Sequence, residues 1–257
     1  MIKDVIEAIA AAARRLFANW GALLISLALY AALVAAIYLF FFTVREATKL
    51  QVVLNLVITL AAITFFFALQ AMGLSYVRIG VGAGYLLKRA LKDCWKILIV
   101  TLPLVLLAWL IVYAFGKIDQ TFFTQSLTAG SKARAWLAIG VSAVRIFLLY
   151  CLLPLMAIHL WIATVREGLA AAFKGFGRSI ARAFAPRSLL IYVLVCAVFG
   201  AISYFLLFKK ATFKDEWTEL WVVGVKTTLA LLMIFLGWLL TLGSMAEMTA
   251  RRAMEEL

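Results

Sequence analysis

Residues 163–190 read ATVREGLAAAFKGFGRSIARAFAPRSLL, a basic amphipathic segment between two long hydrophobic runs. If the segment is one helix, its apolar side chains share a face, because they recur every three or four residues. These side chains are Leu169, Ala172, Phe173, Phe176, Ile180, Ala183 and Phe184. Glu167, Lys174, Arg178 and Arg182 lie on the opposite face. Such a helix suits a membrane surface, with its cations toward lipid phosphates, so we expect a chain built around a bilayer.

The composition of the 257-residue chain indicates a membrane protein. Hydrophobic residues make up 67% of it and charged residues only 14%, whereas a soluble domain has about 25% charged residues. Long apolar runs recur along the chain and are continuous rather than alternating, which favours spanning helices over a β-barrel. We predict a single all-α polytopic membrane domain over residues 1–257 with six transmembrane helices. The predicted spans are residues 20–42, 52–76, 97–115, 136–162, 189–208 and 221–245.

The distribution of basic residues predicts the orientation of the chain. With the N-terminus in the cytoplasm, the cytoplasmic segments hold 15 Lys and Arg residues and the outer segments hold 8. The positive-inside rule therefore favours N-in and C-in. The cytoplasmic segments include a predicted amphipathic helix at 2–17 and the segment 78–96, whose second half is predicted to be a basic helix. The outer segments include a polar loop at 117–134. This topology accounts for the net charge of +13, and no soluble basic domain remains for nucleic-acid binding.

Stretches of the chain are similar to one another. RRLFANWGALLISL at residues 14–27 aligns with RALKDCWKILIVTL at residues 89–102, and IARAFAPRSLLIYVL at 180–194 is a looser third copy. This similarity predicts three repeats, each with an amphipathic helix and two spans. The alternative is that any basic segment followed by an apolar one looks alike. The predicted repeats cover residues 1–77, 78–164 and 165–250.

The region from 163 to 194 also resembles a pattern of a broad bacterial group, in which Glu-Gly precedes a basic amphipathic helix and a span marked by Trp or Pro. The group comprises the uncharacterised six-helix membrane proteins that are similar to the membrane domain of some glycerophosphodiester phosphodiesterases. The resemblance implies an integral protein of the bacterial cytoplasmic (inner) membrane, and it brings no catalytic residues with it. The matching residues are Glu167, Gly168, Ala172, Arg178, Ser179 and Pro186.

Three polar side chains within the predicted spans are candidates for a solute-binding site. Arg145 lies about ten residues inside the fourth span, Lys226 five residues past Trp221, and Asn55 near the start of the second span. A charge near the bilayer centre costs about 2.5–3.5 kcal/mol on insertion scales, so it must face protein or water. Arg145 either forms an anion site or snorkels to the interface. His159 is interpreted as a packing residue rather than a proton relay.

Basic residues gather near the cytoplasmic ends of the spans and form the candidate surface for lipid or partner binding. At the level of the headgroups, each contributes about 1 kcal/mol of attraction to anionic lipid. The alternative interpretation is ordinary anchoring and topology. The residues are Lys88, Arg89, Lys92, Lys96, Arg178, Arg182 and Arg187.

No set of residues typical of an enzyme or a metal site stands out. The chain has one His, three widely separated cysteines and neither a Ser-His-Asp set nor an HExxH motif. We therefore expect a non-enzymatic accessory or scaffold subunit, without metal or cofactor, that binds anionic lipid or a membrane-protein partner through its basic face. The alternative hypothesis is a transporter or channel for an anionic or amphipathic solute, with Arg145 as the binding charge.

Overall fold

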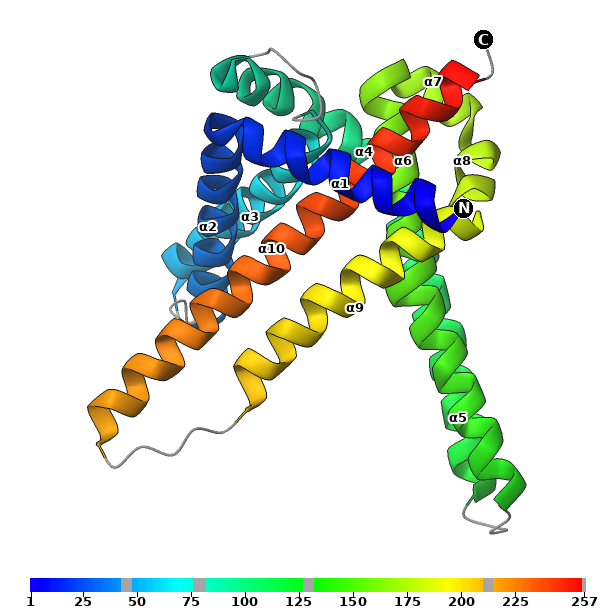
Figure 1. Ribbon diagram of the computed structural model, residues 1–257. Helices are drawn as coiled ribbons and strands as arrows, with labels where there is room; N and C mark the ends of the chain where they lie inside the picture. The colour runs from blue at the N-terminus through cyan, green and yellow to red at the C-terminus, as the bar shows by residue number, and fades with distance from the viewer. Residues whose placement is uncertain (43–47, 76–81, 127–131, 210–214, 256–257) are drawn as a thin grey trace. The chain divides into compact units, whose positions relative to one another are not determined.

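The computed structural model describes all residues except 43–47, 76–81, 127–131, 210–214 and 256–257 (Figure 1). The described residues are almost entirely helical and contain no strand. Among them, six helical segments are long and apolar enough to cross a membrane, which confirms the predicted all-α, six-span class. The elements are α1 (Ile2–Ala18), α2 (Trp20–Phe42), α3 (Lys49–Ser75), α4 (Ala83–Ser126), α5 (Lys132–Phe147), the π-helix η1 (Leu148–Leu152), α6 (Leu153–Glu167), α7 (Leu169–Lys174), α8 (Phe176–Ala183), α9 (Pro186–Phe208) and α10 (Glu216–Glu255).

The helices form two compact units. The first unit comprises Met1–Ile97 and Leu190–Leu257, and the second comprises Leu98–Leu189. In the first unit, α2 pairs with α3, and α10 contacts both α3 and α1. In the second unit, α6 contacts α7 and α8.

Helix α1 packs its apolar stripe against protein within the first unit. The side chains of Val5, Ala8 and Ala12 are fully buried and Leu16 is 2% exposed, a spacing of three or four residues that places them on one face. This face lies across the end of α10 (Figure 1). A helix is therefore present at the predicted residues 2–17, and α10 covers the stripe of Val5, Ala8, Ala12 and Leu16, whereas the apolar side chains of Ile2 and Ile6 are exposed.

Helices α9 and α10 approach each other closely in the first unit at a glycine. A Cβ atom added at Gly237 would lie 2.8 Å from Cβ of Phe199, so only glycine fits here without a shift. Ser203 bridges the same two helices, because its hydroxyl donates to the carbonyls of Phe199 at 2.8 Å and Ala230 at 3.3 Å. Small residues and hydroxyl groups are the usual means of packing helices in lipid.

In the second unit, α4 runs antiparallel to the rod formed by α5, η1 and α6. Two side-chain contacts fix the register. Trp161 Nε1 donates to Thr101 Oγ1 at 2.7 Å, and Arg145 Nη1 lies 2.6 Å from Asp119 Oδ2. Residue 101 is thus beside residue 161, and residue 119 beside residue 145.

The π-helix η1 has a local cause in Pro154. A proline inside a helix has no N–H to donate, and its ring clashes with the carbonyl four residues earlier, here that of Tyr150. The preceding turn is wound more widely instead, and the N–H of Leu153 donates to the carbonyl of Leu148. Such single wide turns keep the backbone hydrogen-bonded where an α-helix cannot continue unchanged.

Helix α4 corrects two sequence-based boundaries. The basic helix predicted in the second half of 78–96 and the span predicted at 97–115 are one continuous helix from residue 83, with Pro103 in its interior, while residues 78–81 lie outside the described residues. The helix also continues through the first part of the polar loop predicted at 117–134, as far as Ser126. No proline or glycine follows Gly116 until residue 130, so the backbone has no reason to leave the helix at the first polar side chains.

The basic amphipathic segment at residues 163–190 is not one helix. Helix α6 continues to Glu167, and Gly168 then adopts φ of 89°, a left-handed conformation that favours glycine. Gly175 interrupts the rest and separates α7 from α8. The single helix predicted from Leu169 to Phe184 is therefore wrong in its continuity, because Gly175 breaks it, although the hydrophobic period alone would allow one helix.

Candidate functional site

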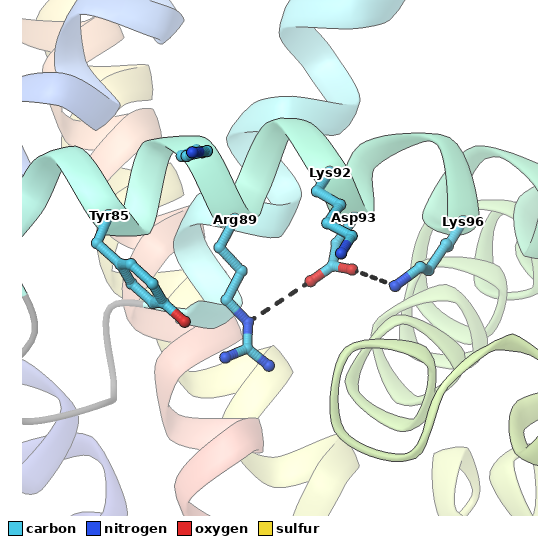
Figure 2. A pocket seen from close by; sticks show the side chains of 6 residues that line it. Tyr85, Arg89, Lys92, Asp93 and Lys96 are labelled. Atoms are coloured by element: carbon cyan, nitrogen blue, oxygen red, sulfur yellow. Dashed lines mark hydrogen bonds and ion pairs between the residues drawn. The ribbon is translucent and has the colours of Figure 1, made fainter.

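A cavity of about 390 Å³ lies along the first turns of α4, within the first unit (Figure 2). We call it the basic cavity. Its described lining residues recur every three or four positions and so share one face of the helix. They are Tyr85, Lys88, Arg89, Lys92, Asp93 and Lys96.

A buried apolar stripe beside the cavity residues of α4 explains why these side chains point the same way. Leu86, Ala90 and Ile97 are fully buried and alternate with the cavity residues at helical spacing. Burial of this apolar face fixes the rotation of the helix about its own axis. The polar face is thereby held toward the cavity.

One carboxylate sits among the four cations of the basic cavity. The side chain of Asp93 is only 8% exposed. Its Oδ1 accepts a hydrogen bond from Lys96 Nζ at 2.6 Å, and its Oδ2 lies 3.7 Å from Arg89 Nε (Figure 2). Within the described part of the chain, Lys88 and Lys92 form no ion pair. Four cations and one anion give the cavity a net charge of +3, and the ammonium groups of Lys88 and Lys92 have no anionic partner among the described residues.

The structure places the other predicted basic residues in the second unit. Arg178 on α8 is exposed, whereas Arg182 on α8 and Arg187 at the start of α9 are half-buried. Among the described basic residues, Lys88, Arg89, Lys92 and Lys96 of α4 line the basic cavity. Of the seven basic residues predicted to form one surface, four therefore line a cavity in the first unit and three belong to the second unit.

Each polar candidate within the spans has its own local environment. Arg145 pairs with Asp119, and the two side chains are 38% and 48% exposed. Lys226 Nζ donates to the backbone carbonyl of Lys209 at 2.5 Å, just beyond the C-terminal end of α9, where a cation is favoured by the helix dipole. The Oδ1 atom of Asn55 is buried and accepts no hydrogen bond from the described residues.

Two lining residues and one polar pair were not expected from the sequence. Tyr85 and Asp93 belong to the basic cavity, and the signal for Asp93 is its position four residues after Arg89 and three before Lys96. His159 Nε2 lies 3.1 Å from Ser188 Oγ, and both side chains are buried, as expected for a hydrogen-bonded packing histidine. In the described ranges, no three His, Cys, Asp or Glu side chains gather as metal ligands would.

Comparisons with known protein families, with characterised proteins and with solved structures give no match to this chain. A function therefore has to be argued from the residues and their geometry. The fold establishes an integral membrane protein with six candidate spans, and the basic cavity is a group of charged side chains around a described pocket.

Proposed function

We propose that this chain is a non-enzymatic accessory or scaffold protein of the bacterial inner membrane that binds anionic phospholipid headgroups in the basic cavity. Its N- and C-termini lie in the cytoplasm in this proposal, as the bias of basic residues favours. The observation that carries it is the pair of uncommitted ammonium groups, Lys88 and Lys92, beside a cavity of about 390 Å³ with net charge +3. Compact ammonium groups are suitable partners for a phosphate oxygen.

The position of the cavity along α4 supports a lipid ligand. Immediately after Lys96, residues 97–116 form a run of twenty residues without a charge. At 1.5 Å per residue this run is about 30 Å long, which matches the hydrocarbon thickness of a bilayer. The cavity residues directly precede this run, which corresponds to the level of the lipid phosphates. Each ammonium group there contributes about 1 kcal/mol of attraction to an anionic headgroup.

The alternative of an anion transporter that uses Arg145 has weaker support. Its guanidinium already pairs with the carboxylate of Asp119 at 2.6 Å, which neutralises the charge that a solute would need. A lipid phosphate displaces no carboxylate when it binds, because Lys88 and Lys92 have no carboxylate partner among the described residues.

The test compares two double variants that remove the same charge. Lys88→Gln/Lys92→Gln empties the basic cavity of its uncommitted cations, whereas Lys174→Gln/Arg178→Gln removes two exposed cations from α7 and α8. Native mass spectrometry of protein in nanodiscs containing phosphatidylglycerol measures the lipid retained by each form. We expect the cavity variant to lose bound lipid at least tenfold more readily, about 1.4 kcal/mol, and the control to retain it. Equal losses would mean that charge alone attracts lipid, and the cavity proposal would be rejected.

A further inference from the structure

The basic cavity contains an acceptor that phosphate binding does not use. Asp93 Oδ1 is occupied by Lys96 at 2.6 Å, but Oδ2 has only Arg89 Nε at 3.7 Å, beyond hydrogen-bonding distance. None of the groups that the structure describes donates a hydrogen bond to Oδ2, and this oxygen is not among the fully buried unpaired atoms, so solvent in the cavity reaches it. A carboxylate this buried is normally fully hydrogen-bonded. The structure therefore presents an open acceptor at the wall of a cation-lined cavity.

A ligand phosphate cannot fill this acceptor. A phosphodiester has no proton to donate at neutral pH, and its charge is repelled by the carboxylate of Asp93. The phosphate is expected instead beside Lys88 and Lys92, which have no anionic partner in the described structure. The group that reaches Asp93 must be a donor attached beyond the phosphate. An ammonium donor is disfavoured by the cavity charge of +3, whereas a hydroxyl group carries no charge into it.

We propose that the basic cavity selects anionic phosphodiester headgroups that carry free hydroxyl groups, such as the glycerol of phosphatidylglycerol. This inference rests on the proposed lipid-binding function and adds the chemical class of headgroup. Lys88 and Lys92 hold the phosphate, and Asp93 Oδ2 accepts a hydrogen bond from a hydroxyl group. Lys96 and Arg89 hold the carboxylate in place from either side along the helix (Figure 2).

The size of the expected preference follows from the kind of hydrogen bond involved. A bond to a charged acceptor is stronger than one between neutral groups. A headgroup without a hydroxyl leaves Asp93 Oδ2 without a donor once the lipid displaces water from the cavity, which adds to the discrimination. We therefore expect about a tenfold preference for the hydroxylated headgroup over a matched one that lacks it.

The experiment uses two lipids of equal charge. Phosphatidylglycerol has two headgroup hydroxyls, and phosphatidylmethanol is the same phosphodiester with a methyl group and no donor. Their dissociation constants for the full-length protein are measured by native mass spectrometry in detergent titrations. We expect phosphatidylglycerol to bind about tenfold more tightly. In Asp93→Ala this ratio should fall to near one, while phosphatidylmethanol binds at least as tightly as before because a negative charge has been removed.

Asp4→Ala is the control, because it removes an exposed carboxylate of α1 whose described ion partner is the N-terminal amine. This variant should keep the tenfold ratio. If Asp93→Ala does not fold, Asp93→Asn preserves the size of the side chain and should lower the ratio, because a neutral amide is a weaker acceptor.

The outcomes separate the two proposals. A wild-type ratio near one, with both lipids still dependent on Lys88 and Lys92, would overturn the hydroxyl selectivity and leave lipid binding intact. A ratio that survives in Asp93→Ala would overturn the role of Asp93. Binding of neither lipid to the wild type would overturn lipid binding itself.

Discussion

The ion pair between Arg15 of α1 and Glu247 of α10 should be a main attachment between the two helices. The carboxylate of Glu247, only 8% exposed, pairs with Arg15 of α1 through one oxygen and with Arg251 through the other at 3.4 Å. Changing Glu247→Gln removes the charge but keeps the size of the side chain. Both arginines then lose their common anion at the point where the two helices cross.

The magnitude follows from the burial of the partners. Removing one partner of a buried ion pair costs about 3–5 kcal/mol, because the remaining charge is left without compensation. Arg15 and Arg251 are 31% and 38% exposed, so water recovers part of their solvation. We expect Glu247→Gln to lower the free energy of unfolding by about 1–3 kcal/mol, where each kcal/mol corresponds to about 2–4 °C in Tm.

Glu7→Gln provides the internal comparison, because Glu7 pairs with the same Arg251 at 3.3 Å but is 49% exposed. An exposed pair contributes about 0–1 kcal/mol. Thermal unfolding in detergent and limited proteolysis between α1 and α2 measure global and local stability. Equal effects of the two variants on Tm and on cleavage would refute the reasoning, since burial would then not determine the strength of the contact.

Two further predictions concern other contacts between helices. Gly237→Ala should destabilise the protein by about 1–2 kcal/mol in thermal unfolding, because the new methyl group meets Phe199 and overpacking outweighs the gain in helix propensity. Gly224→Ala in the same helix has no neighbour within 4 Å and should be neutral or stabilising, so equal losses would contradict the packing argument. Arg145→Leu should be more damaging than Arg145→Leu/Asp119→Leu, with a coupling of up to about 1 kcal/mol, as for other exposed ion pairs, because the single variant leaves the carboxylate of Asp119 without its partner. Simple additivity in the same unfolding assay would argue against that ion pair.

The spans could be predicted from the sequence because apolar runs of this length have few alternatives in water or lipid. The boundaries of the spans could not be predicted, since residues 117–126 have the polar composition of a loop but belong to α4. The register of α4 against α5 depends on the ion pair between Asp119 and Arg145, which the sequence does not indicate. The N-terminal helix was predicted in its extent, but its partner was not, because an apolar stripe fits lipid and protein equally well. The threefold repeat stays a prediction.

The candidate site was predicted in part for a similar reason. The basic stripe from Lys88 to Lys96 is visible from helical spacing alone, and the structure places its four cations around one cavity. Asp93 was not predicted as a site residue, because a single acidic residue in a basic segment indicates only a slightly lower net charge of that segment. Its importance depends on burial and on which oxygen Lys96 occupies, and neither can be derived from a sequence.

The crossing of α1 and the end of α10 also has a consequence for the path of the chain. Because Arg15 and Glu247 form an ion pair, we expect the segments that carry them to lie in one aqueous compartment. Every passage through the bilayer transfers the chain to the other compartment, so the number of passages between these two residues must be even, as six is. A membrane-impermeant reagent should therefore label single cysteines introduced at both segments from one side of a sealed vesicle, and at neither from the other.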